Sequence, residues 1–134
     1  MRDASVVERV KGMYGNTCQI CSRRVDITKS GLAYSEVAHI HAVGKPYEGP
    51  DVVENAVCLC PLCHVKMDRG VLQITDDFEV LDTLEMRSIG PLNYLPEHGI
   101  RVEYLGQHRS RWPGSLDFWN GSECEPQSAG GPQG

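Results

Sequence analysis

The sequence lacks any apolar run that approaches the roughly 20 residues needed to cross a membrane. Its first residues, MRDASVVERVKG, have no apolar core of the kind found in a secretory signal peptide. It also lacks internal repeats and a surplus of basic residues, since 13 Lys and Arg stand against 18 Asp and Glu. These absences argue against a membrane protein and predict a cytoplasmic one. The net charge of −5 disfavours strong non-specific binding to nucleic acid.

The acidic charge is concentrated toward the end of the chain. The length of 134 residues fits one domain. Residues 113–134 are rich in Gly, Pro and Ser and hold three acidic and no basic residues, so we predict a disordered acidic tail after a domain at residues 1–112. The tail accounts for −3 of the net −5, and the domain holds all 13 basic residues. This distribution leaves weak or guided binding to DNA open.

Cysteine is plentiful and is arranged in pairs. Four of the six cysteines form two Cys-x-x-Cys motifs, Cys18/Cys21 and Cys60/Cys63. In a cytoplasmic protein such pairs are more often metal ligands than disulfides. Zn²⁺ favours four tetrahedral nitrogen or sulfur ligands, which the two motifs supply. We therefore predict a structural zinc site, closed by four thiolates and without an open position for a reacting water.

The cysteine pattern also permits other interpretations. The pairs could be redox motifs or free thiols, or His64 could replace Cys63 as the fourth zinc ligand. Cys58, in the apolar run AVCLC, is expected to be a buried thiol, and Cys124 falls in the predicted tail. A zinc site would contribute folding free energy on the order of 10 kcal/mol, which suits a small domain with a thin core.

The residue pattern predicts an α+β fold. Apolar residues at helical spacing predict a helix over residues 3–14, and weak alternation predicts a strand over 33–40. Two β-rich segments around Asp-Asp predict a hairpin over 71–82, and residues 100–112 have the spacing of a short helix. We expect residues 83–100 to be irregular. The prediction is a small zinc-supported ββα domain with an N-terminal helix and a C-terminal hairpin and short helix.

The centre of the chain carries the candidate chemistry. It reads as a strand ending at His39, a Gly- and Pro-rich loop, a second short strand after Asn55, and a helix that carries His64 and Asp68. Hydrolysis of a phosphodiester needs an activated water, and a neutral histidine can take its proton. His39 is the candidate base, and Asn55 the candidate residue to hold its ring by a hydrogen bond. Taken alone, Asn55 would more often be a turn residue.

A second cation is predicted on the helix. His64 and Asp68 are four residues apart and share one helical face, so they could together hold one divalent ion. Water and phosphate oxygens would complete its shell, as suits Mg²⁺, Mn²⁺ or Ni²⁺. Asp68 could equally cap the turn at Arg69 or form an ion pair with Lys66 or Arg69.

Several basic residues flank this proposed site and are the expected DNA contacts. His41 follows His39 on the same strand face and could be a metal ligand, a phosphate contact or a surface residue, of which we favour the last two. The other predicted phosphate contacts are Arg23, Arg24, Lys45, Lys66 and Arg69.

The motifs CQIC, EVAHI, GPDVVENAVCLCPLCH and DRG together resemble the HNH nuclease superfamily, whose ββα-metal fold is supported by zinc knuckles. They resemble more closely the HNH module of bacterial modification-dependent restriction endonucleases, which often accompanies an SRA-type domain that reads methylated cytosine. The resemblance covers about residues 1–112. It implies that His39 is the general base, that Asn55 orients it, and that His64 binds the catalytic metal.

One residue departs from the family pattern. Many HNH enzymes carry Asp or His immediately before the base, as a metal ligand, whereas this chain has Ala38. Either Asp68 replaces that ligand or the catalytic metal site is weak. No SRA-like region fits in the chain, so sequence or modification specificity would come from a partner protein or a separate domain, or would be absent.

The sequence thus predicts a metal-dependent DNA endonuclease or nickase. A single ββα site cuts one strand at a time, so a double-strand break would need a homodimer or two sequential nicks. The resemblance implies 5′-phosphate and 3′-hydroxyl ends. The alternative is a non-catalytic zinc module that binds nucleic acid or protein, with Ala38 as the mark of a lost metal site. A phage-type or toxin nuclease is a further variant within the enzyme class.

Overall fold

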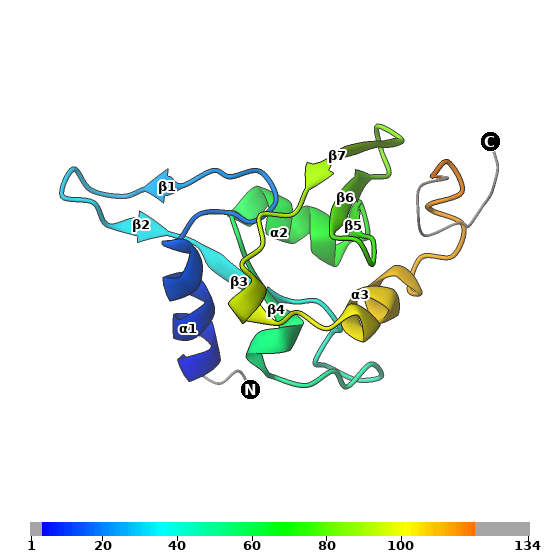
Figure 1. The fold of residues 1–134 in the computed structure, drawn as a ribbon, viewed down its shortest axis with the longest axis horizontal. Helices are drawn as coiled ribbons and strands as arrows, with labels where there is room; N and C mark the ends of the chain where they lie inside the picture. The colour runs from blue at the N-terminus through cyan, green and yellow to red at the C-terminus, as the bar shows by residue number, and fades with distance from the viewer. Residues whose placement is uncertain (1–3, 120–134) are drawn as a thin grey trace.

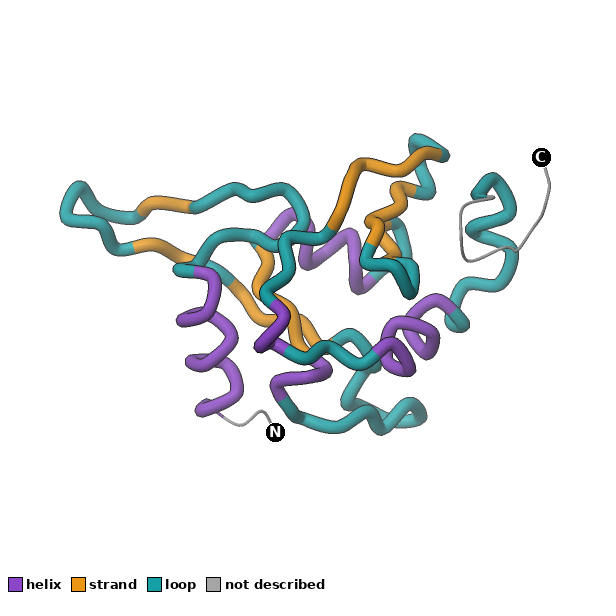
Figure 2. The backbone as a smooth tube through the Cα atoms, viewed as in Figure 1, coloured by secondary structure: helices purple, strands orange, loops and turns teal. Residues whose placement is uncertain are grey.

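The computed structural model describes residues 4–119. Figure 1 shows a small α+β domain of short strands and helices, and Figure 2 shows how much of the backbone is loop. The elements are α1 (Ala4–Tyr14), β1 (Val25–Asp26), β2 (Ala33–Tyr34), β3 (Glu36–His39), the 3₁₀ helix η1 (Val53–Asn55), β4 (Ala56–Leu59), α2 (Pro61–Asp68), β5 (Leu72–Ile74), β6 (Glu79–Asp82), β7 (Arg87–Pro91), η2 (Pro96–His98) and α3 (Val102–Arg109).

The predicted ββα unit is formed by β3, β4 and α2. The two strands pair antiparallel, with Glu36 opposite Leu59 and His39 opposite Ala56, and α2 follows β4 almost at once. Every residue of β4 is buried, because α1 and α2 both pack against this hairpin. Successive side chains of a strand point to opposite faces, so the hairpin contributes to two apolar clusters.

Alternation along β4 divides the core into those two clusters. Ala56 and Cys58 pack with Val6 and Val10 of α1. Residues Val57 and Leu59 point the other way and share the larger cluster, whose members include Ala38, Cys63 and Met67. The β3–β4 hairpin is therefore packed on both faces. This packing fixes the position of His39, the last residue of β3, relative to α2.

The first helix follows the prediction closely. Val6, Val10 and Tyr14 are buried at a spacing of four residues, which gives α1 a single apolar face. Gly15 and Asn16 both take left-handed backbone angles, with φ of 57° and 59°, and the Asn16 N–H bonds to the Lys11 carbonyl. This left-handed turn ends the helix, as glycine and asparagine commonly do.

The C-terminal half contains one strand more than predicted. The hairpin over residues 71–82 is confirmed as β5 and β6, but β7 lies within residues 83–100, which were wrongly expected to be irregular. The sequence did not predict this strand because it contains Gly90 and Pro91, and both residue types are unfavourable inside a sheet. β7 is an edge strand, and its pairing with β6 shifts register between Val80 and Leu81, a setting that tolerates proline.

The segment after α3 packs back onto the ββα unit. Gly70 ends the turn after α2 with φ of 78°, and the Trp112 ring occupies the space where a side chain at position 70 would begin. Residues 113–119, predicted as the start of the disordered tail, form turns, and the Ser115 hydroxyl bonds to Gln73 and to the Trp112 carbonyl. Residues 120–134, with Cys124, lie outside the described residues, so the division into domain and tail stays a prediction.

Within residues 4–119, no helix is long and apolar enough to cross a membrane.

Candidate active site and zinc centre

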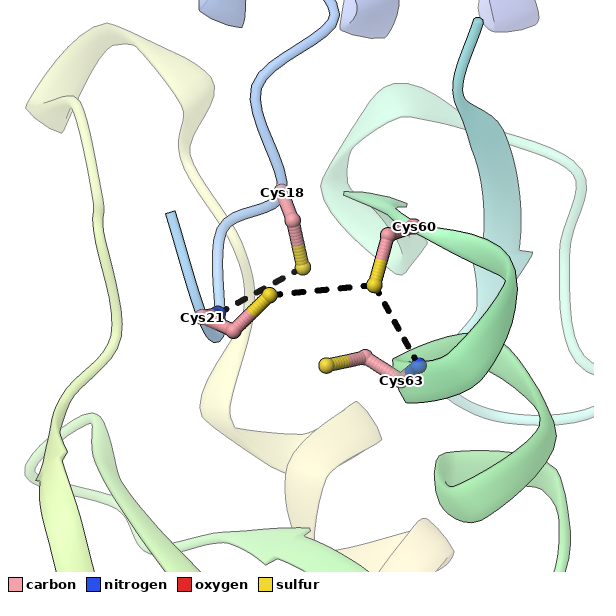
Figure 3. Close-up of side chains that lie close together, drawn as sticks. All are labelled: Cys18, Cys21, Cys60 and Cys63. Atoms are coloured by element: carbon pink, nitrogen blue, oxygen red, sulfur yellow. Dashed lines mark hydrogen bonds between the residues drawn. The ribbon is translucent and has the colours of Figure 1, made fainter. Parts of the chain in front are cut away.

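The two Cys-x-x-Cys motifs come together at one point, as predicted. Figure 3 shows the four side chains directed toward one another, Cys18 and Cys21 from the turn after α1 and Cys60 and Cys63 from the start of α2. Their ligand atoms all lie within 4.8 Å of one another, and the Cys21 and Cys60 sulfurs are 3.7 Å apart. Four sulfurs bound at about 2.3 Å to one tetrahedral zinc would stand about 3.8 Å apart. The donor set and its spacing therefore fit Zn²⁺.

Each motif has the hydrogen bonds of a metal knuckle. The backbone N–H of Cys21 points at the Cys18 sulfur, and that of Cys63 points at the Cys60 sulfur, each at 3.5 Å. A hydrogen bond from Cys63 lowers the pKa of Cys18 to about 4, while the same bond raises the pKa of Cys63. Crowded thiols thus resist full ionisation in the metal-free protein, and a divalent cation would relieve that repulsion.

The structure also places Cys58 and His64 relative to the four-sulfur cluster. Cys58 is buried in the smaller apolar cluster, away from the four ligand sulfurs. The fourth position of the metal cluster is taken by Cys63, whereas His64 turns toward Glu36 and Asp68. The variant site in which His64 replaces Cys63 is therefore not the one formed.

A separate pocket of about 520 Å³ is lined by His39, His64 and Asp68, whereas Asn55 does not line it. His39 reaches it from the end of β3, and His64 and Asp68 reach it from α2. The other lining residues are Ala42, Val43, Gly44 and Arg111. The structure thus brings together three residues that the sequence placed on different elements, and it adds an arginine from the far end of the chain.

His39 has a carboxylate partner that the sequence did not reveal. Its Nε2 lies 2.7 Å from Asp51 Oδ1, and the His39 side chain is 6% exposed. A carboxylate accepts but does not donate, so Nε2 carries the proton and Nδ1 is left as the basic nitrogen. The signal in the sequence was weak, because Asp51 follows Gly-Pro in a loop, where aspartate is common.

Asn55 is fully buried and holds the loop rather than the His39 ring. Its Oδ1 accepts the His41 N–H at 2.8 Å, and its Nδ2 donates to the His41 and Pro50 carbonyls at 2.9 and 2.8 Å. The predicted hydrogen bond from Asn55 to the His39 ring is therefore wrong: Asp51 makes that contact. Asn55 does not contact the His39 ring and instead joins the two ends of the loop that follows β3.

Replacing Asn55 by alanine is expected to destabilise the domain by several kcal/mol, because each buried backbone group left without a partner costs about 1–3 kcal/mol. Urea unfolding of the zinc-loaded protein would measure the change. Asn93→Ala, at an exposed side chain, is the matched control. Equal unfolding midpoints for the two variants would contradict the claim that the Asn55 side chain stabilises this loop.

Both ring nitrogens of His64 face carboxylates. Nδ1 lies 2.7 Å from Glu36 Oε1, and Nε2 lies 3.2 Å from Asp68 Oδ2. The hydrogen bond to Asp68, followed by that to Glu36, raises the pKa of His64 against the lowering effect of burial. Tyr34 donates to the other oxygen of Glu36 at 2.6 Å, which holds this carboxylate in place. Glu36, also missed by the sequence analysis, is the residue that orients the His64 ring.

This arrangement fits a second cation. With Nδ1 held by Glu36, the Nε2 of His64 and the Asp68 carboxylate are the two donors that face each other. A histidine nitrogen with a carboxylate oxygen suits Mn²⁺, Ni²⁺ or Mg²⁺. Ala38 is fully buried in the larger apolar cluster, so the position before His39 contributes packing and not a ligand.

None of the six predicted phosphate contacts is among the residues that line this pocket, and their roles stay predictions. Lys45 is exposed beside the lining residue Gly44, and Arg69 is exposed at the end of α2. Arg24 has a structural role, because it bonds to Asp26 and to the Gly15 and Gly31 carbonyls. The other candidates are Arg23, which is exposed, Lys66, which is half-buried, and His41, whose Nε2 lies 3.0 Å from the Tyr47 carbonyl.

Comparison with known proteins agrees with this geometry. Residues 18–69 match the family model described as HNH endonuclease. Among solved structures, the modification-dependent TagI restriction endonuclease is similar with a TM-score of 0.79 and 41% sequence identity, over 85% of this chain and 41% of that chain. This chain thus spans less than half of that neighbour's length. No curated protein sequence matched.

The match to the family model begins at Cys18, the first of the four clustered cysteines, and ends one residue after Asp68. It contains both cysteine pairs, the β3–β4 hairpin and α2. Residues 18–69 of this chain belong to the HNH endonuclease family.

Proposed function

We propose that this chain is a metal-dependent DNA endonuclease that hydrolyses phosphodiester bonds in the restriction of foreign or modified DNA. The observation that carries the proposal is the pairing of His39–Asp51 with His64–Asp68 at one pocket. The first pair is suited to removing a proton from water, and the second to holding a cation. Both kinds of group are needed for phosphodiester hydrolysis.

The residues of the pocket have distinct tasks. His39 accepts a proton from the attacking water at Nδ1, and Asp51, bonded to Nε2, stabilises the imidazolium that results. Glu36 holds the ring of His64 so that Nε2 stays directed toward Asp68. A divalent cation at His64 and Asp68 would supply positive charge to the scissile phosphate and the leaving oxygen. The products would be 5′-phosphate and 3′-hydroxyl ends.

Asp51→Asn is expected to slow cleavage by roughly tenfold to a hundredfold, as part of the ~10²–10⁴ that a general base contributes. The amide keeps the shape of the carboxylate but cannot stabilise the imidazolium. The initial rate of plasmid cleavage would be measured beside Asp77→Asn, a change at an exposed residue of the β5–β6 turn. A rate for Asp51→Asn equal to that of the control would remove Asp51 from the mechanism.

The function itself is tested by incubating the zinc-loaded chain with supercoiled plasmid and Mg²⁺, Mn²⁺ or Ni²⁺. We expect cation-dependent conversion to nicked circles, whose ends can be religated because they carry a 5′-phosphate. Cleavage that proceeds without an added cation, or the absence of cleavage with all three ions, would reject the proposal.

Specificity would come from outside the described domain. The similar TagI enzyme is modification-dependent, and this chain corresponds to less than half of its length. We propose that a separate domain or protein selects the DNA, that the chain acts in the cytoplasm, and that two copies act together when both strands are cut. Methylated and unmethylated plasmids in the same assay would show whether the pocket itself discriminates.

A second candidate is a non-catalytic zinc module that binds nucleic acid or protein. The observation that favours it is the burial of Ala38, where many HNH enzymes have a metal ligand. Such a module would bind zinc but would not gain cleavage with any added cation.

A further inference from the structure

Arg111 lies in the active-site pocket although it is far from the HNH residues in the sequence. It follows α3, and it lines the pocket together with His39, His64 and Asp68. Figure 1 shows α3 beside the loop that leads from β3 to β4, and the rings of His41 and Tyr104 meet between them at 6.2 Å. The segment after α3 thus contributes Arg111 to the lining of this pocket.

The guanidinium of Arg111 lies against two aromatic rings. Its central carbon lies 4.3 Å from the centre of the Tyr47 ring and 4.6 Å from that of Trp112. Stacking of this kind fixes the plane of the guanidinium and leaves its N–H edge available for hydrogen bonds. Tyr47 comes from the loop after β3, so the stack also joins that loop to the C-terminal segment.

Among the described residues, Arg111 lacks the carboxylate partner that several other arginines have. Arg24, Arg87, Arg101 and Arg109 each pair with a carboxylate. Arg111 forms no such pair among the described residues, and its buried Nε atom has no hydrogen-bond partner there. An unpaired buried donor on a fixed cation is unfavourable unless a ligand satisfies it.

We propose that Arg111 binds a phosphate oxygen of the DNA strand at the cleavage site. This inference rests on the proposed function, because the anion that reaches a pocket containing His39 and His64 is then the DNA backbone. A planar guanidinium can bind two phosphate oxygens at once, and its charge balances that of the phosphate. Arg111 is therefore a substrate-binding residue contributed from outside the family motif.

The test compares Arg111→Gln and Arg111→Lys with Arg101→Gln, a control at an exposed arginine. We expect Arg111→Gln to lower kcat/KM for plasmid cleavage by about 10²-fold, the loss typical of one donor to a charged transition state. Arg111→Lys should recover part of that loss, and Arg101→Gln should match the wild type. Wild-type cleavage with an unchanged rate in Arg111→Gln would overturn this inference and leave the proposed function intact.

Binding supplies a readout that does not need cleavage. A fluorescent duplex would be titrated with His39→Ala and with the double variant His39→Ala/Arg111→Gln at several salt concentrations. Loss of one phosphate contact should reduce the slope of log K against log salt by about 0.9. Equal affinities and slopes would overturn the inference even if the chain does not cleave DNA. It would also be overturned if Arg111→Gln lowered zinc content and unfolding midpoint and Arg111→Lys recovered nothing.

Discussion

Replacing His39 by alanine is expected to abolish cation-dependent DNA cleavage while leaving the fold intact. His39 is the last residue of β3. Two histidines line the pocket: His64 has a carboxylate at each ring nitrogen, whereas among the described residues His39 has a carboxylate partner at Nε2 alone. Loss of a general base lowers the rate by about 10²–10⁴, which brings a modest nuclease to the background of a plasmid assay.

The fold should survive this substitution because the strand does not depend on the imidazole. Val37 and Ala38 supply the apolar contacts of β3, and the backbone pairs with β4 whatever the side chain at position 39. Zinc content and the unfolding midpoint would be measured with the rate. A variant that retains zinc and still cleaves at the wild-type rate would contradict the assignment of His39 as the base.

Removing zinc is expected to unfold the domain. A structural zinc contributes on the order of 10 kcal/mol, which is comparable with the whole net stability of a small domain, about 5–15 kcal/mol. The four cysteines tie the turn after α1 to the start of α2, and Cys60 also caps that helix by accepting the Cys63 N–H. Because α2 carries His64 and Asp68, loss of zinc should remove cleavage together with the fold.

Circular dichroism during titration with a zinc chelator would follow this transition, and Cys60→Ser should reproduce it. Cys58→Ser is the matched control, since Cys58 is equally buried but lies outside the metal cluster. Cleavage should return when zinc and Mg²⁺ are both restored, and not with Mg²⁺ alone. A chelated protein that keeps its helical signal and thermal transition would show that the four cysteines do not hold the fold together.

The local signals in the sequence were strong enough to predict the zinc centre and the ββα unit. Two Cys-x-x-Cys pairs specify a four-sulfur site by ligand chemistry alone, and the i, i+4 spacing of His64 and Asp68 is preserved by helix geometry. The apolar run AVCL, all of which is buried in β4, is likewise a local signal for a strand. In each case the information lies within a few residues of sequence.

The contacts that were missed depend on long-range packing. Asp51 meets His39 across a loop, and Arg111 enters the pocket from beyond α3. Neither lies at a spacing that marks it in the sequence. The sequence predicts a hydrogen bond from Asn55 to the His39 ring. In the structure the Asn55 amide bonds instead to the backbone of the loop that follows β3. β7 was hidden by Gly90 and Pro91, which only an edge position accommodates.

The central claim is that a second cation binds beside His64 in a fold already closed by zinc, since this separates a nuclease from an inert zinc module. Electron paramagnetic resonance of Mn²⁺, added to the zinc-loaded chain with a short DNA duplex, would test it most directly. The account predicts one bound Mn²⁺ per chain in the wild type, displaced by Mg²⁺ and lost in His64→Ala while the zinc is retained. Binding of no Mn²⁺ by the wild type, or equal binding by His64→Ala, would contradict it.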